Sequence, residues 1–282
     1  MERQQRALAI HDISCVGRCS LTVALPIVSA AGIDTSVLPT AVLSTHTGGF
    51  TGFTFRDLTA DIAPITSHWE SLGLHFDSIY TGYLGSLEQI QLVLDIFERF
   101  GQAPTLKMVD PVMADNGELY AIFPQTFPLE MKRLCAKADL ILPNITEACL
   151  MLERDYNPGP YTKDYIEGLL QELAALGPRQ VVLTGVYFGA DDLGAASYDA
   201  ATGQICYATN ARIEGYFHGT GDVFGSALLG GLMNGFTLAD AVQLAVDYTQ
   251  RSIDLTAQLG QEPRYGVCFE RALPFYLERL AR

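Results

Sequence analysis

The chain has 282 residues, of which 49% are hydrophobic and 18% charged, and its formal net charge is −14. This apolar content can bury a large core and excludes a disordered chain. The excess of 32 acidic over 18 basic residues excludes non-specific binding to nucleic acids, because the surface repels phosphate backbones. No apolar run reaches the roughly 18 residues of a membrane helix, and no signal-peptide pattern opens the chain. With six scattered cysteines, this pattern predicts a globular protein of the reducing cytoplasm, without membrane or nucleic-acid partners.

Short apolar runs typical of strands alternate with longer runs of helical period along the chain. The expected strands are 6–11, 36–43, 77–84, 105–110, 139–142 and 180–184, followed by an antiparallel hairpin of 194–198 and 204–209. The expected helices are 20–31, 56–72 with an interruption at Pro64, 87–100, 129–138, 164–176, 220–234, 238–259 and 267–281. No repeat or linker divides this alternation. The pattern predicts one α/β domain over residues 1–282 with a mostly parallel sheet.

The sequence Gly219-Thr220-Gly221-Asp222 stands immediately before an apolar helix. Small residues at a helix start let a ligand approach the unpaired N–H groups of the first turn, which together with the helix dipole form an anion site. A carboxylate beside a transferring phosphoryl group can accept the proton of an attacking hydroxyl. The alternative is that Asp222 only stabilises the helix N-terminus.

Acidic and amide side chains follow two further expected strands. Asp110 ends one strand, Asp115 lies shortly after it, and Asn144 and Glu147 follow the next strand. Such oxygen ligands suit Mg²⁺. The alternatives are that Asp110 is a turn residue before a proline and that Glu147 belongs to a capping box. Together with residues 219–222, these side chains predict a site for a metal and a phosphate.

The sequence contains neither a Walker A loop nor the glycine-rich loop of protein kinases. Phosphate transfer would therefore depend on backbone amides, Mg²⁺ and a single base.

A second group of residues is expected to bind a flat polar ligand. Asp12 is expected at the end of the first strand, and residues 44–53 form a loop of Gly, Thr and aromatic residues that suits closure over a ring. An ordinary flexible connection explains that loop equally well. Tyr83 follows another strand and is a weaker candidate, because buried tyrosines usually belong to a core.

These motifs resemble those of the pyridoxal (vitamin B6) kinases of the ribokinase-like superfamily, in the family order and over nearly the whole chain. The opening sequence is similar to a bacterial branch often called pyridoxamine kinases. The matching segments are Ser44-Thr45-His46-Thr47-Gly48, Thr81-Gly82-Tyr83-Leu84-Gly85-Ser86, Asp110-Pro111-Val112-Met113-Ala114-Asp115, Pro143-Asn144 through Glu147, and Gly219-Thr220-Gly221-Asp222.

The resemblance implies a single-domain, three-layer ribokinase-like fold and ATP-dependent phosphorylation of the 5′-hydroxymethyl group of pyridoxal, pyridoxine or pyridoxamine, usually by a homodimer. It implies that Asp222 is the base and that Gly219, Thr220 and Gly221 hold the developing charge. The other implied roles are Mg²⁺ and triphosphate binding by Asp110, Asp115 and Glu147, phosphate contacts by Asn144 and Thr184, and pyridine contacts by Asp12, Thr47 and Tyr83, with K⁺ as an assisting ion in many members.

Three residues depart from the family pattern. Ala114 stands where Gly is usual, Gly185 replaces a Ser after Thr184, and Asp12 stands where many members have Ser. Asp12 bears on which vitamer is preferred, because an acid favours a protonated ring nitrogen or an amine.

Three other functions remain as alternatives. A hydroxymethylpyrimidine kinase usually has Cys where this chain has Asp222, and the loop at 44–53 does not resemble a sugar kinase site. A non-catalytic B6-binding protein would require no base and no metal carboxylates.

Overall fold

The computed structural model describes residues 3–281, which form two compact units. The first unit contains residues 3–77 and 213–281, and the second contains residues 78–212. The expectation of one domain over residues 1–282 stays a prediction.

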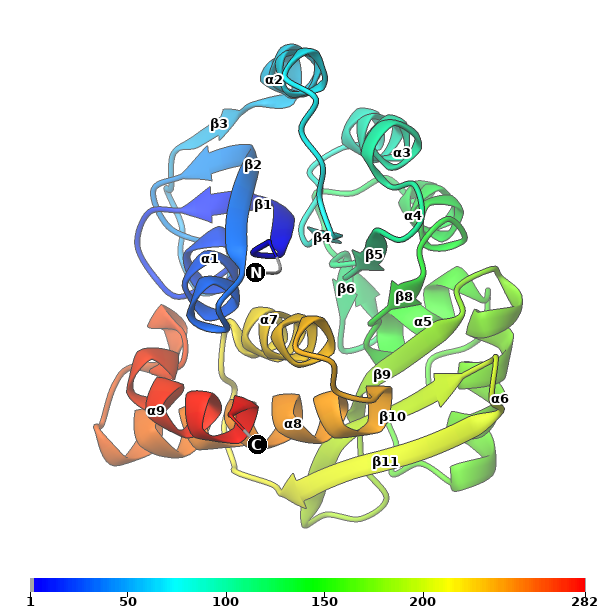
Figure 1. The fold of residues 1–282 in the computed structure, drawn as a ribbon. Helices are drawn as coiled ribbons and strands as arrows, with labels where there is room; N and C mark the ends of the chain where they lie inside the picture. Colours follow the sequence, from blue (N-terminus) through cyan, green and yellow to red (C-terminus); the bar gives the residue numbers. More distant parts are fainter. Residues whose placement is uncertain (1–2, 282) are drawn as a thin grey trace. The chain divides into compact units, whose positions relative to one another are not determined.

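The first unit combines a small sheet of order β1-β2-β3 with helices from both ends of the chain. Strands β1 and β2 pair in parallel, and β3 pairs antiparallel with β2. Helix α1 packs on β1, β2 and α7, and α8 packs on α7 and α9, as Figure 1 lets the reader follow by colour. The elements are β1 (Arg6–Ser14), α1 (Leu21–Ala30), β2 (Asp34–Leu43), β3 (Phe55–Asp57), α2 (Thr59–Ser71), α7 (Thr220–Met233), α8 (Leu238–Gln258), the 3₁₀ helix η1 (Pro263–Tyr265) and α9 (Phe269–Leu280).

The second unit contains strands in the order β11-β10-β9-β8-β5-β4. The pairs β4–β5, β5–β8 and β8–β9 are parallel, whereas β10 pairs antiparallel with both β9 and β11. Helices α5 and α6 pack on β9. The elements are β4 (Ser78–Thr81), α3 (Leu87–Phe100), β5 (Leu106–Val109), the small hairpin β6 (Ala114–Asp115) and β7 (Glu118–Leu119), α4 (Phe127–Cys135), β8 (Leu140–Ile141), α5 (Ile145–Met151), α6 (Lys163–Ala175), β9 (Gln180–Val186), β10 (Asp192–Asp199) and β11 (Gln204–Ala211).

The α/β class with a mostly parallel sheet flanked by helices is confirmed, and three local expectations are corrected. Strand β1 continues to Ser14, so Asp12 lies inside it rather than at its end. Residues 55–57 form β3 instead of the start of a helix, because they pair antiparallel with the edge of β2. Pro64 does not interrupt α2, because the helix begins at Thr59, contains Pro64 and runs on to Ser71.

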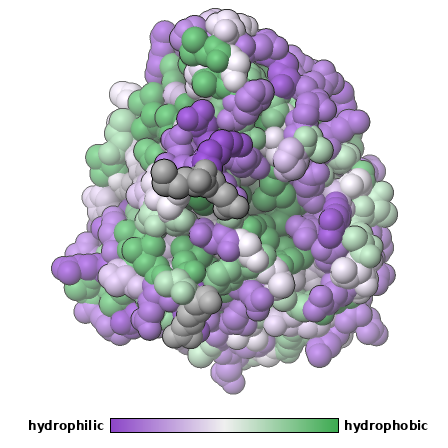
Figure 2. Space-filling model, in the orientation of Figure 1, coloured by the Kyte–Doolittle hydropathy of each residue, from purple (hydrophilic) through white to green (hydrophobic). Residues whose placement is uncertain are grey.

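The face drawn in Figure 2 is mixed, with hydrophilic residues surrounding separate hydrophobic areas. Within residues 3–281, no helix combines the length and the apolar character that a bilayer crossing requires.

Candidate active site

Helix α7 of the first unit begins at a backbone that only glycine fits. Gly219 caps the helix with φ +75°, and a Cβ there would lie 2.0 Å from the carbonyl oxygen of Arg18. Gly221 differs, because a Cβ at this exposed position would have no protein atom within 4 Å. The protein's own packing therefore requires glycine at 219 but not at 221, which leaves the backbone of the first turn open to a ligand. Between them, Thr220 donates to the carbonyl of Phe217 (Oγ1 to O, 3.3 Å).

Asp222 lies in the first turn of α7 and is only partly exposed. Its Oδ2 accepts hydrogen bonds from the backbone N–H of Ser20 at 2.8 Å and from the Cys19 thiol at 3.4 Å. Within residues 3–281 no hydrogen bond to its other oxygen, Oδ1, is found. Burial, with the nearby charge of Asp12, raises the pKa of Asp222 to about 6. Such a carboxylate is ionised at neutral pH and still basic enough to accept a proton.

Asp12 is the second carboxylate of this group and is 5% exposed, inside β1. Its Oδ2 accepts a hydrogen bond from the hydroxyl of Ser14 at 3.3 Å, and the Ser20 side chain, whose hydroxyl donates to the Cys19 thiol at 3.8 Å, also favours its charged form. Burial raises the pKa of Asp12, while these two hydroxyls oppose the rise. The structure thus brings Asp12 and Asp222 close enough for their charges to interact, although the sequence analysis expected them at the ends of a separate strand and helix.

The loop at 44–53 is held by His46, and Thr47, which is predicted to contact the pyridine ring, is exposed. The buried His46 ring donates from Nε2 to the carbonyl of Arg264 at 2.6 Å and accepts at Nδ1 from the N–H of Gly48 at 3.2 Å. Its ring lies 5.0 Å from those of both Phe50 and His218. The loop is therefore tied to the segment that leads into α7, with Thr47 left on its surface.

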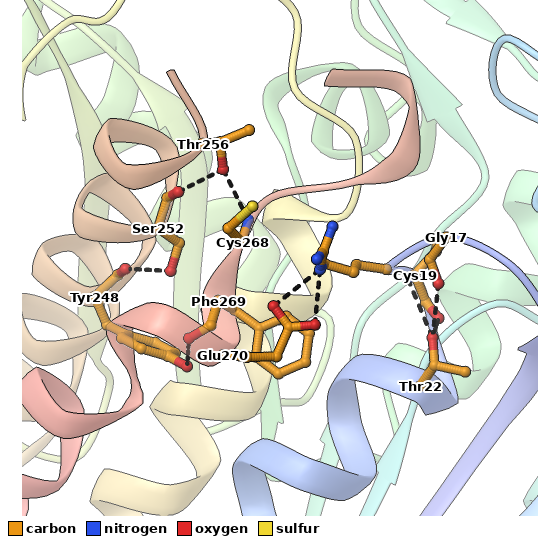
Figure 3. A network of polar contacts seen from close by, with 10 residues as sticks. Gly17, Cys19, Thr22, Tyr248, Ser252, Thr256, Cys268, Phe269 and Glu270 are labelled. Carbon is orange, nitrogen blue, oxygen red and sulfur yellow. Dashed lines mark hydrogen bonds and ion pairs between the residues drawn. The ribbon is translucent and has the colours of Figure 1, made fainter. Parts of the chain in front are cut away.

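The segment 17–22, which carries Cys19 and Ser20, is held from two sides. The Thr22 hydroxyl donates to the carbonyls of Gly17 and Cys19 at 3.2 and 2.8 Å (Figure 3). Arg18 forms an ion pair with Glu270 at 2.7 Å. Hydrogen bonds from α8 hold the start of α9 in turn. The Tyr248 hydroxyl donates to the carbonyl of Phe269, and the Thr256 hydroxyl accepts from the N–H of Cys268. Within α8, the hydroxyls of Ser252 and Thr256 donate to the carbonyls of Tyr248 and Ser252.

In the second unit, Asn144 and Glu147 form the capping box of α5. The Asn144 side chain accepts from the N–H of Glu147, and Glu147 Oε2 accepts from the N–H of Asn144, both at 2.9 Å. Glu147 Oε1 accepts a further bond from the N–H of Met113 at 3.0 Å. Burial raises the pKa of Glu147, against the effect of these N–H groups. The capping alternative is confirmed, and Glu147 connects α5 to the segment after β5.

Asp110 and Asp115 lie on that same segment. Asp110 is 7% exposed, and its N–H donates to the carbonyl of Thr81 at the end of β4. Asp115 is partly exposed and its charge acts on Glu147. The backbone of Thr184 in β9 forms an isolated parallel β-bridge with that of Asn144. The second unit thus brings together the five residues predicted for metal and triphosphate.

These side chains suit a Mg²⁺ ion that also binds a nucleotide better than they suit a structural metal ion whose ligands all come from the protein. In the part of the chain described here, no three His, Cys, Asp or Glu side chains converge as a complete metal site. Mg²⁺ in phosphoryl-transfer sites is usually held through one or two carboxylates, with water and phosphate oxygens as the other ligands. Asp110 and Asp115 suit that role. The two oxygens of Asp115 accept hydrogen bonds from the backbone and side-chain N–H groups of the adjacent Asn116 at 2.9 and 3.0 Å, and both oxygens of Glu147 accept backbone hydrogen bonds.

Tyr83, the remaining predicted residue, is partly exposed in the second unit, with its ring 5.7 Å from that of Phe123. Residues that the sequence analysis did not select are Cys19, Ser20, His46 and His218. A Ser before a helix looks like an ordinary N-cap in a sequence, and no local pattern distinguishes it.

Comparisons with known proteins agree with this fold over nearly the full chain. The model of the phosphomethylpyrimidine kinase family matches residues 28–266. A Bacteroides thetaiotaomicron protein described as a phosphomethylpyrimidine kinase, crystallised with pyridoxal, is 37% identical with a TM-score of 0.92, covering 97% of this chain and 96% of that one. Pyridoxal kinase from Lactobacillus plantarum is 34% identical with a TM-score of 0.88, covering 98% of each chain. Pyridoxal kinase PdxY from Vibrio campbellii is 26% identical over 91% of this chain and 90% of its own length.

The α/β fold and these relatives define a phosphotransferase of the ribokinase-like superfamily. The chain belongs to the phosphomethylpyrimidine kinase family, as a relative of its pyridoxal kinases.

Proposed function

We propose that the protein phosphorylates the 5′-hydroxymethyl group of a B6 vitamer (pyridoxal, pyridoxine or pyridoxamine) with ATP. The observation that carries the proposal is the partly buried Asp222 carboxylate at the glycine-lined start of α7, with a raised pKa and one oxygen without a hydrogen bond from residues 3–281. A protein that merely binds the vitamer requires neither this base nor an anion site. A relative that was crystallised with pyridoxal supports the acceptor class.

In the proposed reaction, Asp222 accepts the proton of the acceptor hydroxyl. The hydroxyl oxygen then forms a bond to the γ-phosphorus of ATP, while the bond between the γ-phosphorus and the leaving ADP breaks. The N–H groups from Gly219 to Gly221 face the charge that develops on the phosphoryl oxygens, and the dipole of α7 adds to their effect. Because such a transition state is largely dissociative, positioning and charge neutralisation supply most of the catalysis.

Asp110 and Asp115 would hold Mg²⁺, which neutralises phosphate charge when bound. Glu147 would position the segment after β5 through its bonds to Met113 and Asn144. In the second unit, Asn144 and Thr184 are the residues proposed to contact phosphate oxygens. In the first unit, Thr220 and Gly221 are proposed for nucleotide binding at the start of α7. A stimulating effect of K⁺ is part of the proposal.

For the acceptor, Asp12 would contact a polar substituent of the pyridine ring, with Thr47 and Tyr83 as further contacts. A homodimer in the cytoplasm is the proposed setting.

The second candidate function is a hydroxymethylpyrimidine kinase, which the description of the matching family favours. Its acceptor also presents a hydroxymethyl group on a flat nitrogen heterocycle. Asp222 argues against it, because members with that activity usually have Cys at this position.

An ADP-release assay with Mg²⁺ and K⁺ tests the choice, with the three vitamers and hydroxymethylpyrimidine offered in parallel. We expect turnover of at least one vitamer at a kcat/KM well above that of the pyrimidine. Turnover of the pyrimidine alone would show that the protein is a hydroxymethylpyrimidine kinase, the second candidate function. Vitamer binding by calorimetry without turnover would indicate a binding protein.

A further inference from the structure

The β6–β7 hairpin of the second unit carries Asp115 next to a turn that its sequence strongly favours. The strands pair with Asp115 opposite Glu118, and the two residues between them have positive φ, +51° at Asn116 and +84° at Gly117. A type I′ turn requires positive φ at both central residues, and Asn-Gly is a preferred sequence for it. The hairpin is therefore formed locally, and its place in the unit depends on what holds it.

Helix α5, which packs on β6 (Figure 1), holds the chain on the N-terminal side of Asp115. Glu147 Oε1 accepts a hydrogen bond from the N–H of Met113 at 3.0 Å. Asn144 Nδ2 donates to the carbonyl of Ala114 at 2.8 Å. These two bonds fix the chain before Asp115, and by themselves they do not restrain the turn beyond it.

Thr146, the residue between these two on α5, supplies the hold on the other side of Asp115. Its hydroxyl accepts a hydrogen bond from the N–H of Gly117 at 3.0 Å, and its side chain is only 3% exposed. The hydrogen bond of a β-turn joins its first and fourth residues, so the N–H of the third residue requires a partner from elsewhere. The ring of Tyr156 lies against Gly117, where an added Cβ would be 2.6 Å from its Cδ1. Thr146 thus anchors a turn that Tyr156 covers.

The turn in its turn orients the Asp115 carboxylate. Oδ1 and Oδ2 of Asp115 accept hydrogen bonds from the backbone N–H and the side-chain amide of Asn116 at 2.9 and 3.0 Å. Each carboxylate oxygen has a second lone pair, so these bonds fix the direction of the group and leave a position on both oxygens for a metal ion or its water. Because Asn116 is the neighbour of Gly117 in the turn, a displaced Gly117 would carry both donors and the carboxylate with it.

We propose that Thr146 is a positioning residue for metal binding: by anchoring the turn at Gly117, its hydroxyl sets the place of the Asp115 carboxylate that Mg²⁺ of the nucleotide would use. Thr146 acts only through the backbone of the hairpin and is not itself a ligand. The inference rests on the proposed function, in which Asp115 serves Mg²⁺, and it does not depend on which acceptor is phosphorylated.

Binding of Mn²⁺, which accepts the same oxygen ligands as Mg²⁺, measures this role without turnover. Free Mn²⁺ is followed by EPR with the protein in excess over the non-hydrolysable ATP analogue AMP-PNP, so that free nucleotide does not compete for the ion. Thr146→Val keeps the shape of the side chain and removes the acceptor of the Gly117 N–H. We expect its Kd for Mn²⁺ to rise about tenfold, as for loss of an outer-shell partner of a metal ligand. Thr146→Ser, which keeps the hydroxyl, should bind nearly as the wild type does.

Thr162→Val is the matched control. The Thr162 hydroxyl accepts a hydrogen bond from the N–H of Tyr165 at 3.2 Å, at the N-cap of α6 in the same unit. Its loss removes one cap and should lower the melting temperature. The Kd for Mn²⁺ should stay unchanged, because no predicted metal ligand lies on that turn.

A double-mutant cycle shows whether Thr146 acts through Asp115. Asp115→Asn removes the charge of one ligand and should weaken Mn²⁺ binding, while Asp110 and the phosphate oxygens keep the binding measurable. In that background, Thr146→Val should change the Kd by less than about twofold, because the carboxylate that it positions is gone. An equal effect of Thr146→Val with and without Asp115 would overturn the proposal.

Hydrogen exchange of the Gly117 amide tests the anchor in the wild type itself. In ¹⁵N-labelled protein, an N–H that is bonded to the buried Thr146 hydroxyl should exchange at least about tenfold more slowly than an unprotected glycine amide. Thr146→Val should remove this protection. An unprotected Gly117 amide in the wild type would overturn the proposal even if Thr146→Val failed to fold.

Failure of this proposal and failure of the proposed function give different results. A wild type that binds Mn²⁺ with AMP-PNP but phosphorylates no acceptor refutes the proposed function, and the Mn²⁺ titrations still decide the role of Thr146. An active wild type whose Thr146→Val variant keeps the Kd for Mn²⁺ and loses only melting temperature reduces Thr146 to a structural residue. An Asp115→Asn variant that binds Mn²⁺ as tightly as the wild type likewise overturns the proposal, since no ligand would remain for Thr146 to position.

Discussion

Replacing Asp222 by Asn should stabilise the folded protein while it removes most of the turnover. The amide oxygen of Asn can still accept the hydrogen bond from Ser20, so the local geometry is kept. The amide carries no charge and cannot take up the proton of the acceptor. Loss of a general base typically lowers kcat by about 10²- to 10⁴-fold.

The magnitude of the stabilisation follows from the pKa of Asp222. Folding raises it from the usual 3.8 to about 6, which corresponds to about 3 kcal/mol in favour of the protonated form at 1.36 kcal/mol per pH unit. Because the side chain is partly exposed, solvent screening reduces this value, and we expect a gain of about 1–2 kcal/mol. For a chain of this size the gain corresponds to roughly 2–4 °C in melting temperature.

The sign of the pH dependence is fixed by the same difference. Since the pKa is raised in the folded state, the ionised carboxylate costs stability above about pH 6, and the cost disappears as the pH falls towards 3.8, where both states are protonated. The advantage of the Asn variant should therefore be largest at neutral pH and vanish in acid. In the wild type, kcat/KM should fall below about pH 6 as Asp222 becomes protonated.

Differential scanning fluorimetry from pH 4.5 to 8 and steady-state kinetics measure both effects. Asp61→Asn is the matched control, because Asp61 is an exposed carboxylate in the first turn of α2. It should leave kcat unchanged and lower the melting temperature slightly through the helix dipole. An Asp222→Asn variant with near-normal kcat, or one that melts no higher than this control at neutral pH, would refute the reasoning.

Three further substitutions test other parts of the account. Gly221→Ala should raise the free energy of unfolding by up to about 1 kcal/mol and yet lower kcat/KM, because the added Cβ meets a ligand rather than protein. The control is Gly168→Ala in α6, where a Cβ also has open space; it should give the same gain in stability with unchanged kinetics. Asp12→Ser should change the ranking of the three vitamers by kcat/KM, and equal rankings in variant and wild type would remove Asp12 from acceptor recognition. Glu147→Gln should destabilise the protein by about 1–3 kcal/mol in urea unfolding, since its amide NH₂ must face one of two backbone N–H groups; a change below about 0.5 kcal/mol would contradict that anchoring role.

Elements with a strong period were predictable from the sequence, and short or edge elements were not. Helix α3 has the predicted limits, Leu87–Phe100, because its apolar spacing is regular and Ser86 caps it. Helix α5 was missed, since seven residues span too few turns to show a period, although its capping residues were identified. Strand β3 is three exposed residues that pair with β2, and pairing of that kind leaves no alternation in the sequence.

The residues of the candidate site also differ in how far the sequence could predict them. Gly219 and Asp222 were found because their signal is local, a run of small residues before an apolar helix. The contacts of Ser20 and Cys19 with Asp222 join residues about two hundred positions apart, and the positive φ of Ser20 has no signature in its residue type. Folding, rather than a motif, creates these features.

The most direct test of the central claim is identification of the product. The wild type is incubated with ATP, Mg²⁺ and each vitamer in turn, and the mixture is examined by proton-coupled ³¹P NMR. We predict a new monoester resonance split by two methylene protons, which marks the 5′-phosphate, and its absence over the same period with Asp222→Asn. Release of inorganic phosphate without that monoester, or equal formation of the monoester by the variant, would contradict the assignment of a B6 vitamer kinase with Asp222 as its base.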